Sequence, residues 1–501
     1  LIKEGKIIRF NEFLGLKIDI DTELLILEEL NRRNSLSSNQ IIDNIDEWIV
    51  EKEKIMKFGE KQKEAIKLAN LNPNIFTLSG FAGTGKSTVA KIILELFSKG
   101  INDSDVTTTA LSGIANKRIM DLTGYDGSTI ASIIAKSEKS QQILDAKILV
   151  IDEASMINVL IFSKLLKSIS SSCKVLIIGD PGQLPPIGAG NVFADIVNNK
   201  LVKGVTLDKI FRQSEESVIT SFAQDIRNGN SPKDLFNEFE DFKFIPIGIK
   251  NYFKRKEVSK RGSEKIMFEQ EKEEVKSKII KSIYYILNEY KTELYQLYNN
   301  REFEEYLRKV QIISPMLGGK LGTRNLNKEA QKIIKPLGDN RLSLSRGDIT
   351  IHDGDKVINE NTEFNYAYVN SEFKRKGTSE KVKVMNGQIG IVQNIDLNRK
   401  VVEVFYPSEK QIIEYKENEI GFRVSPGFAL TTHRTQGAEM DYVILPSSMT
   451  HFMMLNRLLW YTGITRAKKK VYITGEVYAF SIGVKKEDGI FRRTVLSFSN
   501  N

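Results

Sequence analysis

The sequence Leu78-Ser79-Gly80-Phe81-Ala82-Gly83-Thr84-Gly85-Lys86-Ser87 decides the fold of the first half of this chain. It has the form G-x-x-x-x-G-K-[ST], in which glycines let consecutive backbone N–H groups point at phosphate oxygens. An apolar run at 75–78 precedes it as a strand would, and residues 87–97 follow as an amphipathic helix would. This context predicts a P-loop that binds a nucleoside triphosphate, in which Lys86 reaches the outer phosphates and Ser87 ligates Mg²⁺. The predicted phosphate-binding set is Gly80, Phe81, Ala82, Gly83, Thr84, Gly85, Lys86 and Ser87.

Composition places the chain among soluble globular proteins with several domains. It has 501 residues, of which 41% are hydrophobic and 27% charged, enough for real cores. No apolar stretch is as long as a membrane span, and the N-terminus lacks the apolar region of a signal peptide. The single cysteine, Cys173, excludes an internal disulfide and fits a reducing compartment, so we expect a cytoplasmic protein. The net charge of +9 permits a polyanionic partner without demanding one.

Short apolar runs separated by helical patterns predict an α/β fold. Candidate strands lie at 75–78, 106–109, 148–151 and 175–178, as expected of a buried parallel sheet. Periodic apolar residues predict one long amphipathic helix over 275–297. Between 346 and 420 the pattern becomes β, and Asn386-Gly387 predicts a hairpin between strands at 381–384 and 388–392. The predicted domains are an N-terminal helical segment (1–58), a P-loop domain (59–202), and a second α/β domain (203–345 and 421–501) that carries a small barrel (346–420).

Polar residues at the ends of two further candidate strands complete a hydrolytic site. Asp152 and Glu153 follow the strand at 148–151; Asp152 would hold Mg²⁺ through water, and Glu153 would accept a proton from the attacking water. Gln183 follows the strand at 175–178, on the sheet edge where P-loop proteins bind ligand, and would sense the terminal phosphate. Arg212 and Arg466 are candidates to stabilise the charge of the transferred phosphoryl group.

Taken in order, these motifs resemble those of superfamily 1 helicases of the RecD-like and phage Dda-like branch. Gly80–Ser87, Asp152–Ser155 and Gly179–Pro186 resemble motifs I, II and III, and Arg212 resembles the motif IV arginine. The run Ala429-Leu430-Thr431-Thr432-His433-Arg434-Thr435-Gln436-Gly437-Ala438-Glu439 resembles motif V, and residues 459–468 resemble motif VI. The resemblance spans roughly residues 60 to 475.

The resemblance implies two RecA-like domains with ATP bound between them and an SH3-like insert in the second. It adds Gln62, which reads adenine, and Glu439 to the ATP-binding residues, and lets Arg212 and Arg466 reach the ATP from the second domain. It implies 5'→3' translocation on single-stranded DNA, with Mg²⁺ and ATP as cofactors. The implied DNA contacts are Ser112, Gly113, Thr129, Thr432, His433 and Thr435. For His433, a buried structural role is the alternative.

Three positions depart from the family pattern. Leu111 stands where relatives usually have Pro, and Ala131 where they usually have His. Only residues 135–146 lie between the segment around Ala131 and the motif II strand. In relatives this connection carries a strand-splitting hairpin, the pin. The departure puts duplex separation by a pin in doubt, but not ATP hydrolysis or translocation.

Two other functions therefore stay open beside a 5'→3' DNA helicase. One is a single-strand translocase that displaces proteins and unwinds duplex poorly, with RNA as a variant of the track. The other is a non-catalytic nucleic-acid-binding subunit. We expect a monomer in a bacterial or phage-infected cell, with replication or recombination proteins as partners and no membrane. The role of residues 1–58 cannot be read from the sequence.

Overall fold

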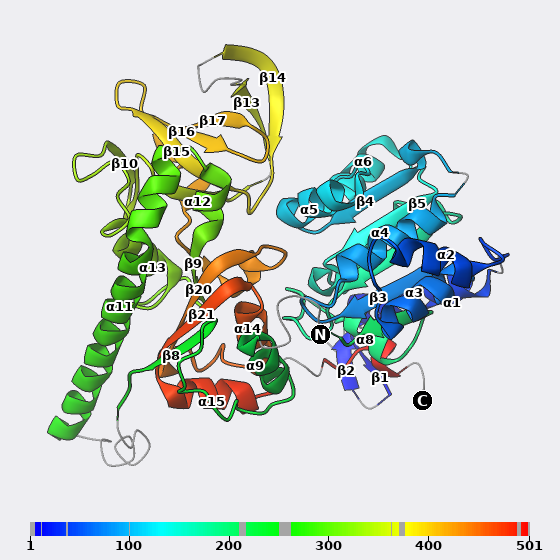
Figure 1. Cartoon of the computed structure of the whole chain (residues 1–501), viewed down its shortest axis with the longest axis horizontal. Helices are drawn as coiled ribbons and strands as arrows, with labels where there is room; N and C mark the ends of the chain where they lie inside the picture. Colours follow the sequence, from blue (N-terminus) through cyan, green and yellow to red (C-terminus); the bar gives the residue numbers. More distant parts are fainter. Residues whose placement is uncertain are drawn as a thin grey trace. The chain divides into compact units, whose positions relative to one another are not determined.

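The structure, a computed structural model, describes residues 6–11, 13–36, 39–99, 101–209, 217–249, 262–361, 363–369, 376–487 and 492–498. The chain forms two compact units (Figure 1). The first comprises Leu1–Glu216 with Asp488–Asn501, and the second comprises Ser217–Glu487. Among the described helices, none is long and apolar enough to cross a membrane.

A five-stranded parallel sheet forms the centre of the first unit. Its strand order is β4-β5-β6-β3-β7, so the P-loop strand β3 lies inside the sheet. All four strands expected in this half of the chain are present, which confirms the predicted parallel α/β fold. The strands are β3 (Ile75–Gly80), β4 (Val106–Ala110), β5 (Ile148–Asp152), β6 (Lys174–Gly179) and β7 (Gly204–Leu207).

Helices cover both faces of this sheet, because successive strand residues point to opposite sides. Leu149 packs in one apolar layer with α1, α6, α7 and α8, whereas Val150 packs in the other with α3, α4 and α5. The first layer contains α1 (Lys17–Ser35), α6 (Ile130–Ser140), α7 (Val159–Lys167) and α8 (Val192–Asn198). The second contains α3 (Glu60–Asn70), α4 (Lys86–Phe97) and α5 (Gly113–Thr123).

The segment before the P-loop domain contains a hairpin as well as helices. The hairpin joins β1 (Ile7–Phe10) to β2 (Phe13–Leu16), and α1 follows directly. Ile26 and Leu30 of α1 are buried against the sheet, so this helix is part of the first unit's core. The short helix α2 (Ile45–Glu53) packs beside α3.

Two of the predicted domain boundaries are wrong. Residues 204–207 belong to the first unit, because β7 pairs in parallel with β3 and extends the first sheet. The end of the chain also returns to the first unit, where α16 (Val495–Phe498) buries Val495 and Leu496 against α1 and α8. The apolar side chains of this short segment find their core there and not in the second unit.

The second unit has its own five-stranded parallel sheet, ordered β19-β9-β20-β21-β8. One long helix, α11 (Gly262–Asn299), packs on one face together with α12 (Phe303–Lys309), and it includes the helix predicted over 275–297 (Figure 1). The other face carries α9 (Val218–Arg227), α14 (Arg457–Ile464) and α15 (Val477–Lys485). The strands are β8 (Phe242–Pro246), β9 (Val310–Ser314), β19 (Ala429–Thr431), β20 (Met440–Ser447) and β21 (Ala467–Gly475).

A seven-stranded antiparallel sheet is inserted between β9 and β19, in the order β14-β13-β17-β16-β15-β12-β18. The helix α13 (Thr323–Gln331) and a hairpin of β10 (Ser343–Arg346) and β11 (Ile349–His352) precede it. That the insert is SH3-like stays a prediction. Its strands are β12 (Lys356–Asn359), β13 (Glu363–Val369), β14 (Lys376–Val384), β15 (Ile389–Asp396), β16 (Val401–Tyr406), β17 (Gln411–Lys416) and β18 (Val424–Pro426).

The hairpin predicted around Asn386-Gly387 is wrong, although a turn forms there. The strand before the turn, β14, pairs with β13, whereas the strand after it, β15, pairs with β12 and β16. The turn is held by Asn359 of β12, whose carbonyl accepts from Gly387 N–H at 2.8 Å and whose side chain donates to the Met385 carbonyl at 2.9 Å. Tertiary pairing thus overrides the local hairpin signal.

Burial of Glu23 makes the stability of the first unit depend on pH. Glu23 is 5% exposed and accepts a hydrogen bond from Val495 N–H, and burial raises the pKa of its carboxyl from 4.5 to about 7. Because the folded-state pKa is the higher one, its stabilising contribution is full below about pH 4.5 and is lost as pH rises through about 7. We therefore expect Glu23→Gln to gain stability over wild type by roughly 1–3 kcal/mol between about pH 5 and pH 8.

Urea unfolding followed by circular dichroism at a series of pH values measures this difference. Asp195, whose pKa burial raises to about 6, titrates in both proteins, so only the difference between the two pH profiles is assigned to Glu23 and its interaction with Asp195. Identical pH profiles for wild type and Glu23→Gln would show that Glu23 is not the group responsible.

Candidate functional site

The P-loop joins β3 to α4 through glycines in left-handed conformations. Gly83 and Gly85 have φ values of +82° and +78°, which other residues adopt at a cost. A Cβ atom on Gly85 would lie 2.7 Å from Nε2 of Gln62, so this side chain and the loop fit closely. Gln62 is buried, donates to the Thr84 carbonyl at 3.1 Å and accepts from Gly59 N–H at 3.0 Å. The residue predicted to read adenine is therefore in contact with the P-loop.

Lys86 is the first residue of α4 and places a partly buried cation in the predicted site. Its Nζ donates to the carbonyls of Gly80 and Phe81, each at 2.8 Å. Burial lowers the pKa of this ammonium group, and the carboxylates of Asp180, Glu153 and Asp152 act in the opposite direction. The cation thus lies in a field set by acids at the ends of β5 and β6, and phosphate oxygens would compete with the two loop carbonyls for its protons.

The two predicted catalytic acids lie together at the end of β5. Asp152, its last residue, is 8% exposed, and burial followed by the charge of Glu153 raises the pKa of its carboxyl to about 6. Glu153 is 9% exposed and has a left-handed backbone, with φ of 50° and ψ of 42°. Such a conformation costs a non-glycine residue about 1–3 kcal/mol and persists only where the surroundings enforce it.

Gln183 brings an unpaired acceptor to the same sheet edge. It lies in the loop after β6, where Asp180 accepts from Gly182 N–H at 2.9 Å. The Gln183 side chain is 5% exposed, and its Oε1 has no hydrogen-bond partner within the described part of the chain. A buried amide oxygen without a partner is costly, so the site favours a ligand or water that donates a hydrogen bond there.

The oxygen atoms at this edge suit a Mg²⁺ ion that the protein and a bound nucleotide would hold together. Ser87 lies in the first turn of α4, and Asp152 ends the strand next to β6, which itself pairs with β3. Within the described ranges, no group of three or more Asp, Glu, His or Cys residues could hold a metal by itself. Such a site fits Mg²⁺, which in nucleotide-binding proteins takes one or two protein ligands and completes its shell with phosphate oxygens and water.

One residue that sequence reasoning missed, Arg492, holds the loop that carries Gln183. Its guanidinium donates three hydrogen bonds to carbonyls of one loop: Pro186 at 3.0 Å, Gly188 at 2.5 Å and Gly190 at 2.7 Å. Only the fold brings position 492 beside this loop, so no local pattern could have indicated the contact. Arg492 thus fixes a loop that begins three residues after Gln183.

The DNA contacts predicted in the first unit lie at two helix N-termini. Ser112 caps α5, where its Oγ accepts from Ala115 N–H at 3.2 Å, and Gly113 begins that helix. Thr129 caps α6, where its Oγ1 accepts from Ser132 N–H at 3.4 Å. Helix N-termini suit phosphate oxygens, but both hydroxyls already act as caps.

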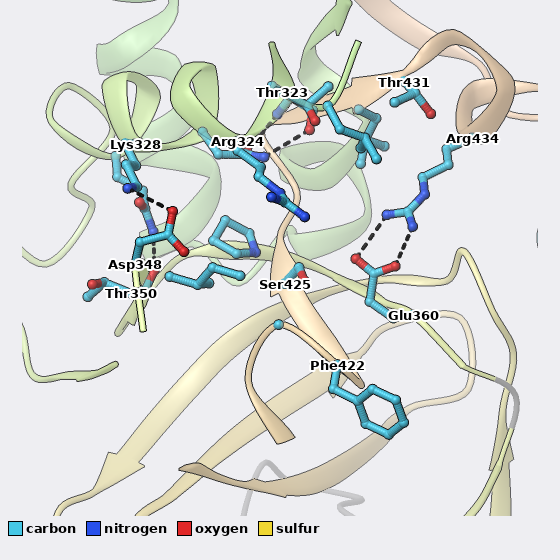
Figure 2. A pocket seen from close by; sticks show the side chains of 18 of the residues that line it. Thr323, Arg324, Lys328, Asp348, Thr350, Glu360, Phe422, Ser425, Thr431 and Arg434 are labelled. Carbon is cyan, nitrogen blue, oxygen red and sulfur yellow. Dashed lines mark hydrogen bonds and ion pairs between the residues drawn. The ribbon is translucent and has the colours of Figure 1, made fainter. Parts of the chain in front are cut away.

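The DNA contacts predicted in the second unit are mostly buried. Thr432 is 1% exposed and Thr435 is fully buried, where its hydroxyl donates to the Thr432 carbonyl at 2.9 Å. Burial lowers the pKa of His433, which is half-buried. Arg434 (Figure 2), which the sequence did not single out, is exposed, and Thr431 is partly exposed, as His433 is.

Three predicted ATP-site residues cannot be placed against the P-loop. Arg466 is 3% exposed and donates to the carbonyls of Thr462 at 3.1 Å and Ala438 at 3.3 Å. Glu439 forms an ion pair with Lys468 at 2.9 Å. Both belong to the second unit, and Arg212 lies outside the described residues. Their roles in ATP hydrolysis stay predictions.

Comparisons with known proteins find helicase relatives across most of the chain. Residues 57–247 match the family described as AAA domain, and residues 426–474 match the UvrD-like helicase C-terminal domain. The ATP-dependent RecD2 DNA helicase of Deinococcus radiodurans is 24% identical over 88% of this chain and 52% of its own length. The RecBCD enzyme subunit RecD of Buchnera aphidicola (Acyrthosiphon pisum) is 26% identical over 90% of this chain and 76% of that one. The crystal structure of Pif1 helicase from Candida albicans, at 15% identity, covers 87% of this chain and 97% of its own with a TM-score of 0.48.

The chain spans only part of some of these relatives. It covers about half of the length of the Deinococcus protein and a smaller share, 40%, of a relative from Methanocaldococcus jannaschii that is 29% identical. Activities of those whole proteins therefore do not transfer directly to this chain.

The three hydrogen bonds of Arg492 predict a measurable loss when they are removed. We expect Arg492→Ala to lower the free energy of unfolding of the first unit by about 1–3 kcal/mol, because three carbonyls, two of them partly buried, lose a charged donor. The free energy of unfolding of Arg492→Lys should lie between those of wild type and Arg492→Ala, since one ammonium cannot replace a forked guanidinium. Urea unfolding and limited proteolysis of the loop at 186–190 measure both effects. The neighbouring Arg493, which is exposed, gives the matched control Arg493→Ala; equal effects at 492 and 493 would contradict this role.

Proposed function

We propose that this chain is a RecD-like superfamily 1 helicase, an ATP-driven motor that moves 5'→3' along single-stranded DNA and separates duplex. The observation that carries the proposal is the group of Lys86, Asp152, Glu153 and Gln183 at one edge of the first sheet. This edge joins a partly buried cation, two buried carboxylates and an unpaired amide oxygen around a P-loop. Such a set suits hydrolysis of a bound nucleoside triphosphate.

In this proposal each side chain has a separate task in hydrolysis. The loop N–H groups and Lys86 bind the phosphates, and the Lys86 ammonium offsets the charge of the outer phosphate. Ser87 and Asp152 would hold Mg²⁺, which neutralises charge on the phosphate oxygens when it is bound. Bound Mg²⁺ would favour the ionised carboxylate of Asp152, which is the form that can act as a ligand.

Glu153 and Gln183 act on the attacking water and the outer phosphate. Glu153 accepts the proton that the water loses as it attacks, and its fixed backbone keeps the carboxylate at the sheet edge. Gln183 presents its unpaired amide oxygen to the water or to a donor beside the phosphate. Arg212 and Arg466 are proposed, from the family resemblance, to stabilise the transition state.

The track and the partners follow from the family rather than from the site. Relatives include an ATP-dependent RecD2 DNA helicase and a RecBCD enzyme subunit, which supports DNA as the track and other proteins as partners. The helix N-termini at Ser112 and Thr129 can bind phosphates without reading bases, as a motor that ignores sequence requires. RNA is the alternative track.

A second function, single-strand translocation without efficient unwinding, is favoured by one feature of the first unit. Residues 130–148, all described, pass from α6 to β5 through seven residues that contain a single bridge, Leu144 with Ile169, and no hairpin. Where relatives are expected to carry a pin, this connection is short. Strand separation would then need another element of this chain or a partner protein.

Replacing Glu153 tests the hydrolytic assignment. We expect Glu153→Gln to lower DNA-stimulated ATP turnover by about 10²–10⁴-fold, because the proton acceptor is lost. Binding of ATP and of single-stranded DNA should persist, since Gln keeps the size of the side chain and the ligands of Mg²⁺ remain. Phosphate release and equilibrium binding measure the two properties separately. Wild-type turnover in this variant would refute the role of Glu153, and turnover that DNA or RNA never stimulates would refute a nucleic-acid motor.

A further inference from the structure

Arg492 holds one side of the loop at 186–190, which follows Gln183. Its acceptors are every second carbonyl of that loop, those of Pro186, Gly188 and Gly190. The donors of a guanidinium lie in one plane in a fixed arrangement. Three bonds from one such group to one loop therefore fix the orientation of the loop as well as its distance from the C-terminal segment.

The start of α7 holds the two carbonyls in between. The Ile187 carbonyl accepts from Asn158 Nδ2 at 2.9 Å, and the Ala189 carbonyl accepts from Val159 N–H at 3.2 Å. α7 is the first α-helix after Glu153, the predicted general base. Every carbonyl from 186 to 190 thus accepts a hydrogen bond, and the loop is held between the C-terminal segment and the helix that follows the catalytic acids.

Two glycines let the loop lie this close to α7. Gly188 and Gly190 have φ values of +109° and +77°, which other residues adopt at a cost. A Cβ atom on Gly190 would lie 2.0 Å from Cγ2 of Val159, and one on Gly188 would lie 2.8 Å from Nδ2 of Asn158. The loop therefore has no room to shift toward α7, and loss of Arg492 would release it in the opposite direction.

The connection from this loop back to Gln183 is short and stiff. The backbone N–H of Gln183 donates to the Asp180 carbonyl at 3.2 Å, and Leu184 is buried. Pro185 and Pro186 follow, and the ring of each proline fixes φ at about −65°. A displacement at Pro186 is therefore passed on toward Gln183 and is not absorbed by the chain between them.

The segment that carries Arg492 is itself anchored in the first unit. Val495 and Leu496 are buried in its core, and Thr494, which is 2% exposed, donates from its hydroxyl to Asp195 Oδ2 at 2.7 Å. Arg492 lies directly before this anchor and is partly buried. The guanidinium therefore acts on the loop from a fixed base.

We infer that Arg492 is a positioning residue for ATP hydrolysis, which holds the side chain of Gln183 in place through the loop at 186–190. The inference rests on the proposed function, in which Gln183 acts on the attacking water and the outer phosphate. Arg492 does not act on the nucleotide itself. The inference assigns the C-terminal segment, which lies beyond all the motifs of the family resemblance, a part in catalysis.

A double-mutant cycle between Arg492 and Gln183 tests whether one acts through the other. We expect Gln183→Ala to lower kcat of DNA-stimulated ATP turnover by roughly 10- to 1,000-fold. Arg492→Ala should lower kcat by roughly 5- to 100-fold, and by no more than Gln183→Ala does. KM for ATP should stay within about threefold of wild type, because the P-loop is unchanged. When Gln183 is already Ala, Arg492→Ala should lower kcat by less than about twofold.

Asn158→Asp tests the other side of the loop independently. Asp keeps an oxygen to cap α7, where Asn158 Oδ1 accepts from Ile161 N–H at 2.9 Å, but it loses the donor to the Ile187 carbonyl. We expect this variant to lower kcat when Gln183 is present and to leave kcat unchanged when Gln183 is Ala.

Two further variants and a folding measurement complete the comparison. Arg492→Lys keeps the charge with fewer fixed donors and should restore part of kcat. Arg493→Ala removes an exposed neighbour and should keep the wild-type kcat. Circular dichroism at the assay temperature measures the folded fraction of each variant. Loss of folded protein would lower apparent kcat by the same factor with and without Gln183, so the cycle separates destabilisation from misplacement of Gln183.

The outcomes distinguish this inference from the proposed function. Equal loss of kcat from Arg492→Ala with and without Gln183 would overturn the inference. Wild-type kcat in folded Arg492→Ala, or a raised KM as its only effect, would also overturn it. In these cases the proposed function stands, because Gln183→Ala still lowers turnover. If Gln183→Ala keeps wild-type turnover, or if wild type hydrolyses no ATP, the proposed role of Gln183 fails and the inference fails with it.

Discussion

The balance of charge between the ammonium group of Lys86 and the three acids around it is the interaction on which the candidate site of the first unit depends. A desolvated cation is costly unless carboxylates balance it, and here Asp180, Glu153 and Asp152 supply the balance. Those acids can only converge because the parallel order β4-β5-β6-β3-β7 brings the ends of β5 and β6 to the same edge as the P-loop. Helices packed on both faces stabilise this sheet, and the side chains at its edge form the candidate site.

Most of the first unit could be predicted because its determinants are local in the sequence. Four apolar runs became β3, β4, β5 and β6, since a strand with apolar side chains on both faces is stable only when both faces are buried. The acids after β5 and Gln183 after β6 were found because they follow these strands directly. In each case one short segment contains both the structural and the chemical signal.

The errors have a common physical origin, which is contact between residues far apart in the sequence. Asn386-Gly387 forms a turn, but Asn359 and the neighbouring strands decide its partners. The return of residues 492–498 to the first unit, and the hold of Arg492 on the Gln183 loop, depend on apolar burial at Val495 and Leu496. Burial of Thr432 and Thr435 likewise follows from packing that no motif reveals. The roles assigned to Arg212, Arg466 and Glu439 stay predictions.

The central claim is that ATP hydrolysis at this sheet edge drives movement along one strand. Strand displacement from a 5'-tailed forked DNA, with wild type beside Lys86→Ala, tests it most directly, and displacement of a protein block from single-stranded DNA completes it. The account predicts that wild type with ATP, and not Lys86→Ala, displaces the protein block from single-stranded DNA. If wild type also releases the duplex strand, the short connection from α6 to β5 suffices for unwinding. Removal of neither block nor strand by wild type, or release only from 3'-tailed forks, would contradict the account.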